Sequence, residues 1–187
     1  MTETIAEIVA AHRAGAMTPA QTVARAYQRI RDHNDPAVFI SLRDEKDALA
    51  EAEALSNKDA SQLPLYGVPV AVKDNIDAAG LATTAACPAF SYMPAQDSTA
   101  VARLRAAGAI VIGKTNLDQF ATGLVGVRSP YGIPGNPMRG DLIPHAPRGT
   151  RMPLSDGGGA PGIASAAGVR PSCPARPTPG PVLPRRP

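Results

Sequence analysis

The spacing of apolar and polar residues predicts a series of helices at the start of the chain. Apolar side chains recur there every three or four positions, which is the period of a helix that buries one face. Thr18 is followed by Pro19 and then by Gln21, the pattern of a capping box at a helix start. A short strand is expected at residues 37–42. We therefore predict helices at residues 4–14, 18–33 and 44–55.

Beyond these helices the pattern changes to short apolar runs that are typical of buried strands. Residues 68–72 are almost unbroken in apolar character and rich in β-branched side chains, and residues 109–112 form a second such run. Asp97 or Ser98 starts a helix between the two runs, and Gly108 ends it. A strand, a helix and a strand joined by short loops favour a parallel pair in an α/β sheet.

The first of these strands leads directly into a lysine, Lys73, which turn-forming residues follow. A lysine at the end of a buried strand lies where its charge is poorly solvated. Burial favours the neutral amine, and a neutral amine is a base. The alternative is that Lys73 extends toward solvent and pairs with Asp74 or Asp77. The strand pattern alone favours this alternative.

The segment around Lys73 resembles the amidase signature family, and further segments do so in the family's order. Within that family, GLVGVRSPYG is most similar to the amidase domain of allophanate hydrolases. The resemblance implies the N-terminal portion of an α/β fold with a mixed sheet flanked by helices. The matching pieces are LYGVPVAVKDNID (65–77), GLATTAACPAF (80–90), DSTAVARLRAAGAIVIGKTNLDQFATG (97–123) and SPYGIPGNP (129–137).

The resemblance also implies an enzyme, an amidase that hydrolyses linear amides with a serine–cis-serine–lysine triad. Lys73 matches the family's catalytic lysine. Its neutral amine would take a proton from a bridging serine, which would deprotonate the nucleophilic serine. Ammonia would leave, and water would release the acyl-enzyme. In the allophanate hydrolase branch the small-molecule amide is allophanate, which becomes ammonia and carbon dioxide. No metal or organic cofactor is expected.

Two further residues are candidates for substrate binding, Gly123 and Arg128. Asn116 is predicted to cap a helix that ends at Gly123, so both candidates would follow that helix. Glycine permits close approach of the backbone to a ligand, and an arginine can bind a carboxylate such as that of allophanate with two hydrogen bonds. The alternative for Arg128 is a surface arginine that pairs with an acid.

Both serines of the implied triad lack a counterpart in this chain. The family has a glycine- and serine-rich run shortly after the Asn-Pro that matches Asn136-Pro137, where this chain reads PHAPRGT at residues 144–150. Three serines downstream, Ser155, Ser165 and Ser172, do not lie in matching contexts. We therefore expect this chain to be inactive as it stands.

The composition changes where the resemblance ends, so we predict a partial amidase domain at residues 1–143 and a disordered tail at residues 144–187. The tail has eleven prolines, six arginines and one acid, a net charge of +5, which leaves −2 of the total +3 for residues 1–143. Such a segment buries too little apolar surface to offset its ordering entropy. A shifted reading frame explains the change, and sequencing the gene near codon 144 tests this hypothesis. The rival hypothesis is a genuine tail that serves as a polyproline ligand.

The remaining features narrow the function classes. The two cysteines form no disulfide framework, and Cys87 is expected to be a free thiol in a loop. His12 and His33 are expected on helix faces rather than as metal ligands. No membrane span, secretion signal or nucleic-acid partner is predicted, which indicates a cytoplasmic protein, and the full-length form could be a homo-oligomer. The alternatives are another amidase, including the amidase component of a transfer-RNA amidotransferase, or a noncatalytic fragment.

Overall fold

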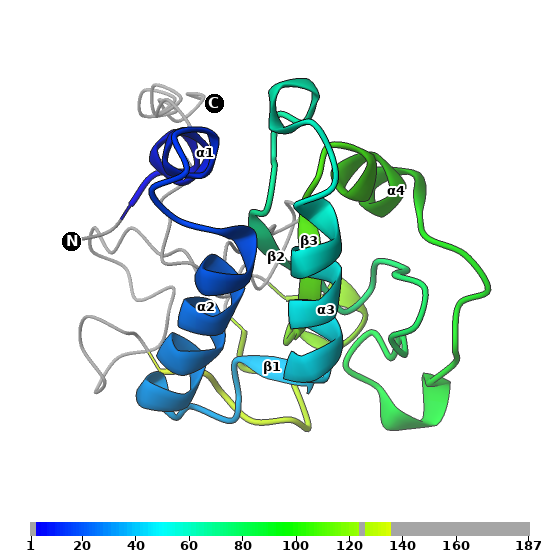
Figure 1. Cartoon of the computed structure of the whole chain (residues 1–187). Helices are drawn as coiled ribbons and strands as arrows, with labels where there is room; N and C mark the ends of the chain where they lie inside the picture. Colours follow the sequence, from blue (N-terminus) through cyan, green and yellow to red (C-terminus); the bar gives the residue numbers. More distant parts are fainter. Residues whose placement is uncertain (1–2, 124–125, 136–187) are drawn as a thin grey trace, which may run out of the picture.

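A three-stranded sheet with helices on both faces forms the centre of the computed structural model, which describes residues 3–123 and 126–135 (Figure 1). In chain order the elements are α1 (Ile5–Arg13), α2 (Pro19–His33), β1 (Phe39–Leu42), α3 (Glu45–Leu55), η1 (Ala60–Gln62), β2 (Pro69–Lys73), η2 (Pro88–Phe90), α4 (Thr99–Ala106), β3 (Ile110–Thr115) and η3 (Gln119–Ala121), where η marks a short 3-10 helix. The predicted order of helices and strands up to β3 is confirmed.

The sheet is mixed, as the family resemblance implies. Its strand order is β1-β3-β2, with β2 parallel to β3 and β1 antiparallel to β3. The helix α4 connects the two parallel strands, which confirms the predicted strand–helix–strand unit. In this register Lys73, the last residue of β2, is paired with Thr115, the last residue of β3. The two parallel strands therefore end together.

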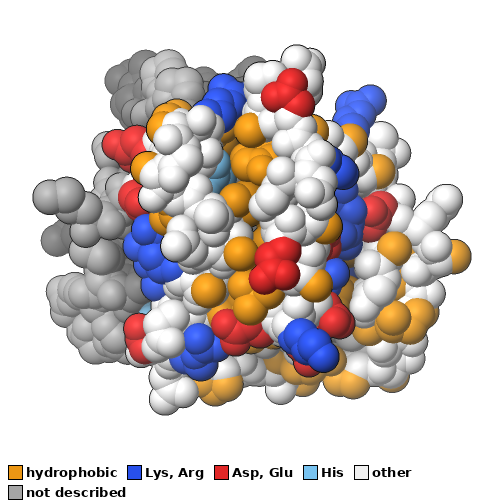
Figure 2. All heavy atoms as spheres, in the orientation of Figure 1, with side chains coloured by type: hydrophobic (Ala, Val, Ile, Leu, Met, Phe, Trp, Pro, Cys, Tyr) orange, Lys and Arg blue, Asp and Glu red, His pale blue; other side chains and the backbone are white. Residues whose placement is uncertain are grey.

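Each face of the sheet has its own apolar core because successive side chains of a strand point to opposite faces. On one face α2 and α3 pack side by side over Ile110 and Ile112. On the other face α1 and α4 pack against the valines of β2 and against Val111. Figure 2 shows apolar side chains in the seam between α2 and α3, with charged side chains outside it. Alternation along the strands thus places helices on both sides of the sheet.

The helix starts follow the capping residues that the sequence indicates. Thr18 and Gln21 exchange hydrogen bonds with each other's backbone N–H groups, and Thr4 forms the same capping box at α1. Of the two residues proposed to start α4, Ser98 is the cap, whereas the Asp97 carboxylate accepts a hydrogen bond from the Ala79 N–H at 2.7 Å. Local hydrogen bonding therefore sets these boundaries.

The prediction of a helix after Asn116 is wrong. Asn116 is buried, and its side-chain amide donates to the carbonyls of Ala37 and Gly132 at 2.9 and 3.0 Å. Its side-chain oxygen accepts hydrogen bonds from the Leu117 N–H and the Ser129 hydroxyl. Because these contacts use the whole side chain, it is not available to cap a helix in the usual way. Only the short turn η3 forms there.

Predictions for residues 144–187 lie outside the described residues, as do those for Cys173 and for the three downstream serines. Cys87 lies in the described part as a half-buried free thiol, as predicted. In the described ranges, no helix is both long and apolar enough to span a bilayer.

His12 lies on the buried face of α1 and does not need a metal to satisfy its ring. One ring nitrogen, Nδ1, lies 2.7 Å from the Tyr66 carbonyl oxygen, and the other, Nε2, lies 2.7 Å from the Thr22 hydroxyl oxygen. Burial lowers the pKa of His12, and the hydrogen bond to Tyr66 opposes this effect. The predicted helix-face role is confirmed, and the imidazole links α1, α2 and the turn before β2.

The lowered pKa of His12 predicts a loss of stability in mild acid. The unfolded chain binds a proton at the ordinary histidine pKa of about 6.5, whereas the folded chain binds it only at a lower pH. The free energy of unfolding should therefore fall as the pH falls below about 6.5. Urea unfolding between pH 7.5 and 5.5 measures this slope, which His12→Gln should reduce. The matched control His33→Gln changes an exposed histidine, and an equal effect there would contradict the assignment.

Candidate active site

Lys73 is buried at the end of β2, as the sequence predicts, with only 4% of its surface exposed. The Asp74 N–H donates to the Thr115 carbonyl at 3.1 Å, so the pairing of β2 with β3 continues past the lysine. The Lys73 carbonyl then accepts a hydrogen bond from the Ile76 N–H at 2.9 Å, which closes the turn. The backbone around the amine is therefore fixed on both sides.

The alternative interpretation, in which Lys73 pairs with Asp74 or Asp77, is wrong. The Asp74 carboxylate faces Lys114, and the Asp77 carboxylate accepts hydrogen bonds from the Thr83 and Tyr92 hydroxyls at 2.8 and 2.7 Å. Among the residues that the structure describes, Lys73 makes no ion pair within 4.0 Å. Its amine is thus buried without a compensating carboxylate in this part of the chain.

Lys114, on the neighbouring strand β3, is a second buried lysine that the sequence analysis missed. Its side chain is fully buried, and Nζ lies 3.6 Å from Oδ1 of Asp74. The same amine donates to the Ala82 carbonyl and to the Thr83 hydroxyl, both at 3.1 Å. Burial lowers the pKa of Lys114, and the negative charge of Asp74 opposes this effect. No pattern in the sequence links Lys114 to a carboxylate forty positions away.

The two lysines point to opposite faces of the sheet. In the register of the parallel strands, Lys73 is paired with Thr115 and Lys114 with Val72. A register shift between Val70 and Ala71 interrupts the alternation along β3, so the face of Lys114 follows from its pairing with Val72, whereas Lys73, the next residue of β2, lies on the other face. The Asp74–Lys114 pair therefore lies beneath the strand end that carries Lys73.

Asp118 brings the two predicted substrate-binding residues together, although the sequence analysis did not single it out. Its carboxylate is fully buried and accepts hydrogen bonds from the N–H groups of Gly126 and Arg128 at 2.9 and 2.7 Å. Gly123 packs so closely on Asp118 that a Cβ atom would overlap the carboxylate. The absence of a side chain at Gly123 thus serves the packing of this loop.

The side chain of Arg128 is exposed and donates to the Thr122 carbonyl at 3.4 Å. Within the described ranges no ion pair involves it, so the predicted alternative of a surface ion pair is not observed. Its role in substrate binding, like that of Gly123, stays a prediction. Its guanidinium retains donors that can meet a carboxylate.

Two hollows on the surface of the described part lie away from Lys73. A cavity of about 650 Å³ lies beside the Asp97–Arg105 ion pair and is also lined by Arg43 and Gly80. A smaller one of about 230 Å³ follows the edge of β1. Lys73 lines neither cavity. In these residue ranges no cluster of three or more His, Cys, Asp or Glu side chains could hold a metal ion.

What the described site can supply is a buried amine at a strand end. It cannot complete an acyl transfer by itself, because nucleophilic catalysis also needs a hydroxyl or thiol placed beside the base. The segment where the resemblance would place a bridging serine lies outside the described residues.

Comparison with known proteins gives one family for most of the chain. The profile of the Amidase family matches residues 21–145. The chain is 67% identical over 99 residues to urea amidolyase from Lachancea kluyveri and 61% identical over 95 residues to that from Saccharomyces cerevisiae. Each match covers about half of this chain and 5% of the relative. The chain is also 42% identical over 141 residues, 74% of its length, to a glutamyl-tRNA(Gln) amidotransferase subunit from Thermus thermophilus, of which it covers 28%.

Solved structures agree with the sequence matches. Allophanate hydrolase from Kluyveromyces lactis aligns with 75% of this chain and 23% of its own, with a TM-score of 0.65 and 44% identity. Peptide amidase from Stenotrophomonas maltophilia aligns with 88% of this chain and 32% of its own, with a TM-score of 0.64 and 31% identity. The chain therefore corresponds to a quarter to a third of these proteins, and the fold is the N-terminal portion that the resemblance implies.

The buried pair Asp74–Lys114 predicts strong energetic coupling between the two residues. Lys114→Met leaves a buried carboxylate without its cation, which should lower the free energy of unfolding by about 3–5 kcal/mol. Asp74→Asn leaves a buried ammonium and should cost a similar amount. The double variant should lose at least about 1 kcal/mol less than the sum of the two single losses. Urea unfolding measures all three.

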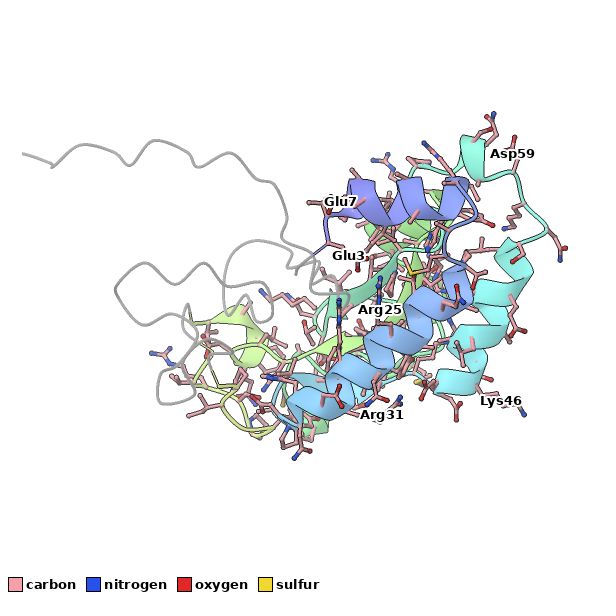
Figure 3. The ribbon with its side chains drawn as sticks, turned by 60° about the vertical axis from the view of Figure 1, so that its left-hand side comes forward. Glu3, Glu7, Arg25, Arg31, Lys46 and Asp59 are labelled. Carbon is pink, nitrogen blue, oxygen red and sulfur yellow. The ribbon has the colours of Figure 1, made fainter. Side chains whose placement is uncertain are left out.

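Arg31 and Glu45 provide the matched control, because their 2.6 Å ion pair lies on the surface. Figure 3 shows Arg31 on the outer face of α2. Arg31→Gln should change stability by less than about 1 kcal/mol. Additive losses at Asp74 and Lys114 would contradict the coupling.

Proposed function

The chain belongs to the Amidase family, and on that premise we propose that it carries the catalytic lysine, Lys73, of an amidase that acts on allophanate. The observation that carries this proposal is the burial of Lys73 at the end of β2 with no ion pair among the described residues. A buried amine at the end of a strand is held in one place and shielded from bulk water. This is the property that a triad lysine needs.

The choice of allophanate rests on the identities with known proteins. The chain is 67% and 61% identical to two urea amidolyases, against 40% to mandelamide hydrolase from Pseudomonas putida. The structural match to an allophanate hydrolase, at 44% identity, supports the same choice. Allophanate carries a carboxylate, which the exposed guanidinium of Arg128 could bind with two hydrogen bonds.

The proposed mechanism gives Lys73 the first proton transfer. Its amine removes a proton from a bridging serine, and that serine removes the proton of the nucleophilic serine. The nucleophile attacks the amide carbonyl, ammonia departs with a proton returned through the same relay, and water releases the acyl group. Neither serine is found in this chain at the positions that the family resemblance implies. The 187-residue chain should therefore release no ammonia from allophanate.

A second candidate is the amidase component of a transfer-RNA amidotransferase. The match to the Thermus thermophilus amidotransferase covers 74% of this chain, whereas the urea amidolyase matches cover 50–52%. Both candidates would use Lys73 in the same role, so they differ in substrate and not in the chemistry of the first step. The higher identity favours allophanate.

Activity in a completed domain tests the proposal. Residues 1–143 are fused to the remaining part of the Kluyveromyces lactis allophanate hydrolase amidase domain, and ammonia release from allophanate, mandelamide and glutamine is measured. The fusion should prefer allophanate, and the 187-residue chain should release no ammonia. Lys73→Met should lower kcat at least about 100-fold, because general-base catalysis contributes 10²–10⁴. Lys73→Arg should lower kcat as much, because arginine stays protonated.

Lys46 is the matched control, since it is exposed and points away from the ribbon at the start of α3 (Figure 3). Lys46→Met should leave kcat unchanged. An active fusion whose kcat survives Lys73→Arg would refute the role of Lys73. Turnover by the 187-residue chain itself would refute the conclusion that its serines are missing.

A further inference from the structure

The segment that contains Lys114 has the spacing of a phosphate-binding loop but a different structure. Gly108 stands five positions before Gly113, so residues 108–115 follow the G-x-x-x-x-G-K-T pattern. In a phosphate-binding loop these residues expose backbone N–H groups to the anion. Here residues 110–115 are the fully buried strand β3, paired on both sides. The buried position of Lys114 therefore indicates a role other than phosphate binding.

Lys114 joins three separate pieces of chain at one buried point. It extends from β3 to the turn after β2, where it faces Asp74 Oδ1 at 3.6 Å and the Asp74 carbonyl at 3.4 Å. It also donates to the Ala82 carbonyl and the Thr83 hydroxyl, which belong to the loop after that turn. One ammonium group with three hydrogens thus meets acceptors from two loop segments.

The other oxygen of Asp74 holds the next part of the same loop. Oδ2 accepts hydrogen bonds from the N–H and the hydroxyl of Thr84, the first at 3.0 Å, and from the Ala86 N–H at 3.4 Å. Ala85 and Ala86 both have positive φ angles, of 50° and 57°. L-residues with a side chain rarely adopt this conformation, and it persists only where the surroundings impose it. Asp74 supplies part of that constraint.

A second strained pair lies against the first. Phe120 and Ala121 have φ angles of 52° and 57°. The Phe120 N–H donates to the Ala85 carbonyl at 2.9 Å, and the Gln119 side-chain amide donates to the Ala86 carbonyl at 3.2 Å. The loops that leave the two parallel strands are therefore hydrogen-bonded to each other.

From these contacts we propose that Lys114 is a positioning residue for Lys73. The buried Asp74–Lys114 pair holds residues 82–86, which include the strained Ala85 and Ala86, and ties that loop to the residue that follows Lys73. Lys114 acts through Asp74, whose N–H is bound to the Thr115 carbonyl, and not by contact with the Lys73 amine, which lies on the other face of the sheet. The proposal rests on the proposed function only in treating Lys73 as the reactive amine.

Lys114 is not itself the base in this account. Its amine is enclosed by Asp74, Ala82 and Thr83, all of which accept hydrogen bonds or carry negative charge. A base must reach the proton that it removes, and the full burial of Lys114 leaves no access for a substrate. Its contribution is to hold Asp74, the residue that follows Lys73, in one position.

Chemical labelling of the 187-residue chain tests the proposal without using turnover. Trace acetic anhydride is added between pH 6 and pH 11, and acetylation of Lys73 relative to exposed Lys46 is measured by mass spectrometry. The variant is Asp74→Asn with Lys114→Met, which removes both charges and leaves neither partner unpaired. Because the turn that follows Lys73 would lose its anchor at Asp74, Lys73 acetylation should rise at least about tenfold relative to Lys46, and its pH profile should be displaced. The matched control, Arg31→Gln with Glu45→Gln, should change the ratio less than twofold.

Hydrogen exchange separates local opening from global unfolding. Amides of β2 and β3 should keep their protection in the double variant, while residues 82–86 lose theirs. An unchanged Lys73 ratio and pH profile in a variant with protected strands would overturn the proposal. If the double variant does not fold, Thr84→Val, which removes one hydrogen bond to Asp74 and keeps both charges, should raise the ratio in the same direction, and an unchanged ratio there would also overturn it. Loss of activity in the completed domain tests the role of Lys73 as the base. The labelling result does not depend on activity and tests the role of Lys114 separately.

Discussion

The desolvation of one amine is the constraint on which the site depends. Lys73 ends a buried strand, and an ammonium group removed from water is costly unless a carboxylate compensates it. The nearby carboxylates of Asp74 and Asp77 are bound to other partners. The fold thus separates Lys73 from acids that lie next to it in sequence, and it does so by directing each acid toward a different loop contact.

That separation is achieved by a second buried lysine and by strained backbone. Lys114 is the ionic partner of Asp74. The Asp74 carboxylate in turn accepts hydrogen bonds from the loop that contains the left-handed residues Ala85 and Ala86. A buried ion pair adds little to the free energy of unfolding, but removing only one of its partners lowers that free energy strongly. The pair is therefore better suited to selecting one loop conformation than to raising overall stability.

Local signals predict much of this fold, and long-range contacts account for the failures. The capping residue Thr18, the helical periodicity around it and the apolar run before Lys73 act through neighbours in sequence, so the pattern reveals them. Asn116 has the chemistry of a helix cap, but its partners are Ala37 and Gly132, and no local rule indicates them. Lys114 and Asp118 were missed for the same reason, since their burial depends on how separate loops meet the strand ends. The position of Lys73 could be predicted, whereas the network that supports it could not.

Chemical rescue is the most direct test that the Lys73 amine accepts a proton. Lys73→Gly in the completed domain removes the amine and leaves a cavity in a buried site, which small primary amines can enter. If the Lys73 amine accepts the proton, kcat should rise with the concentration of the neutral form of the added amine, and more basic amines should rescue better. A rate that does not respond to any amine, in a folded variant of an active parent enzyme, would contradict the role of Lys73 as the base.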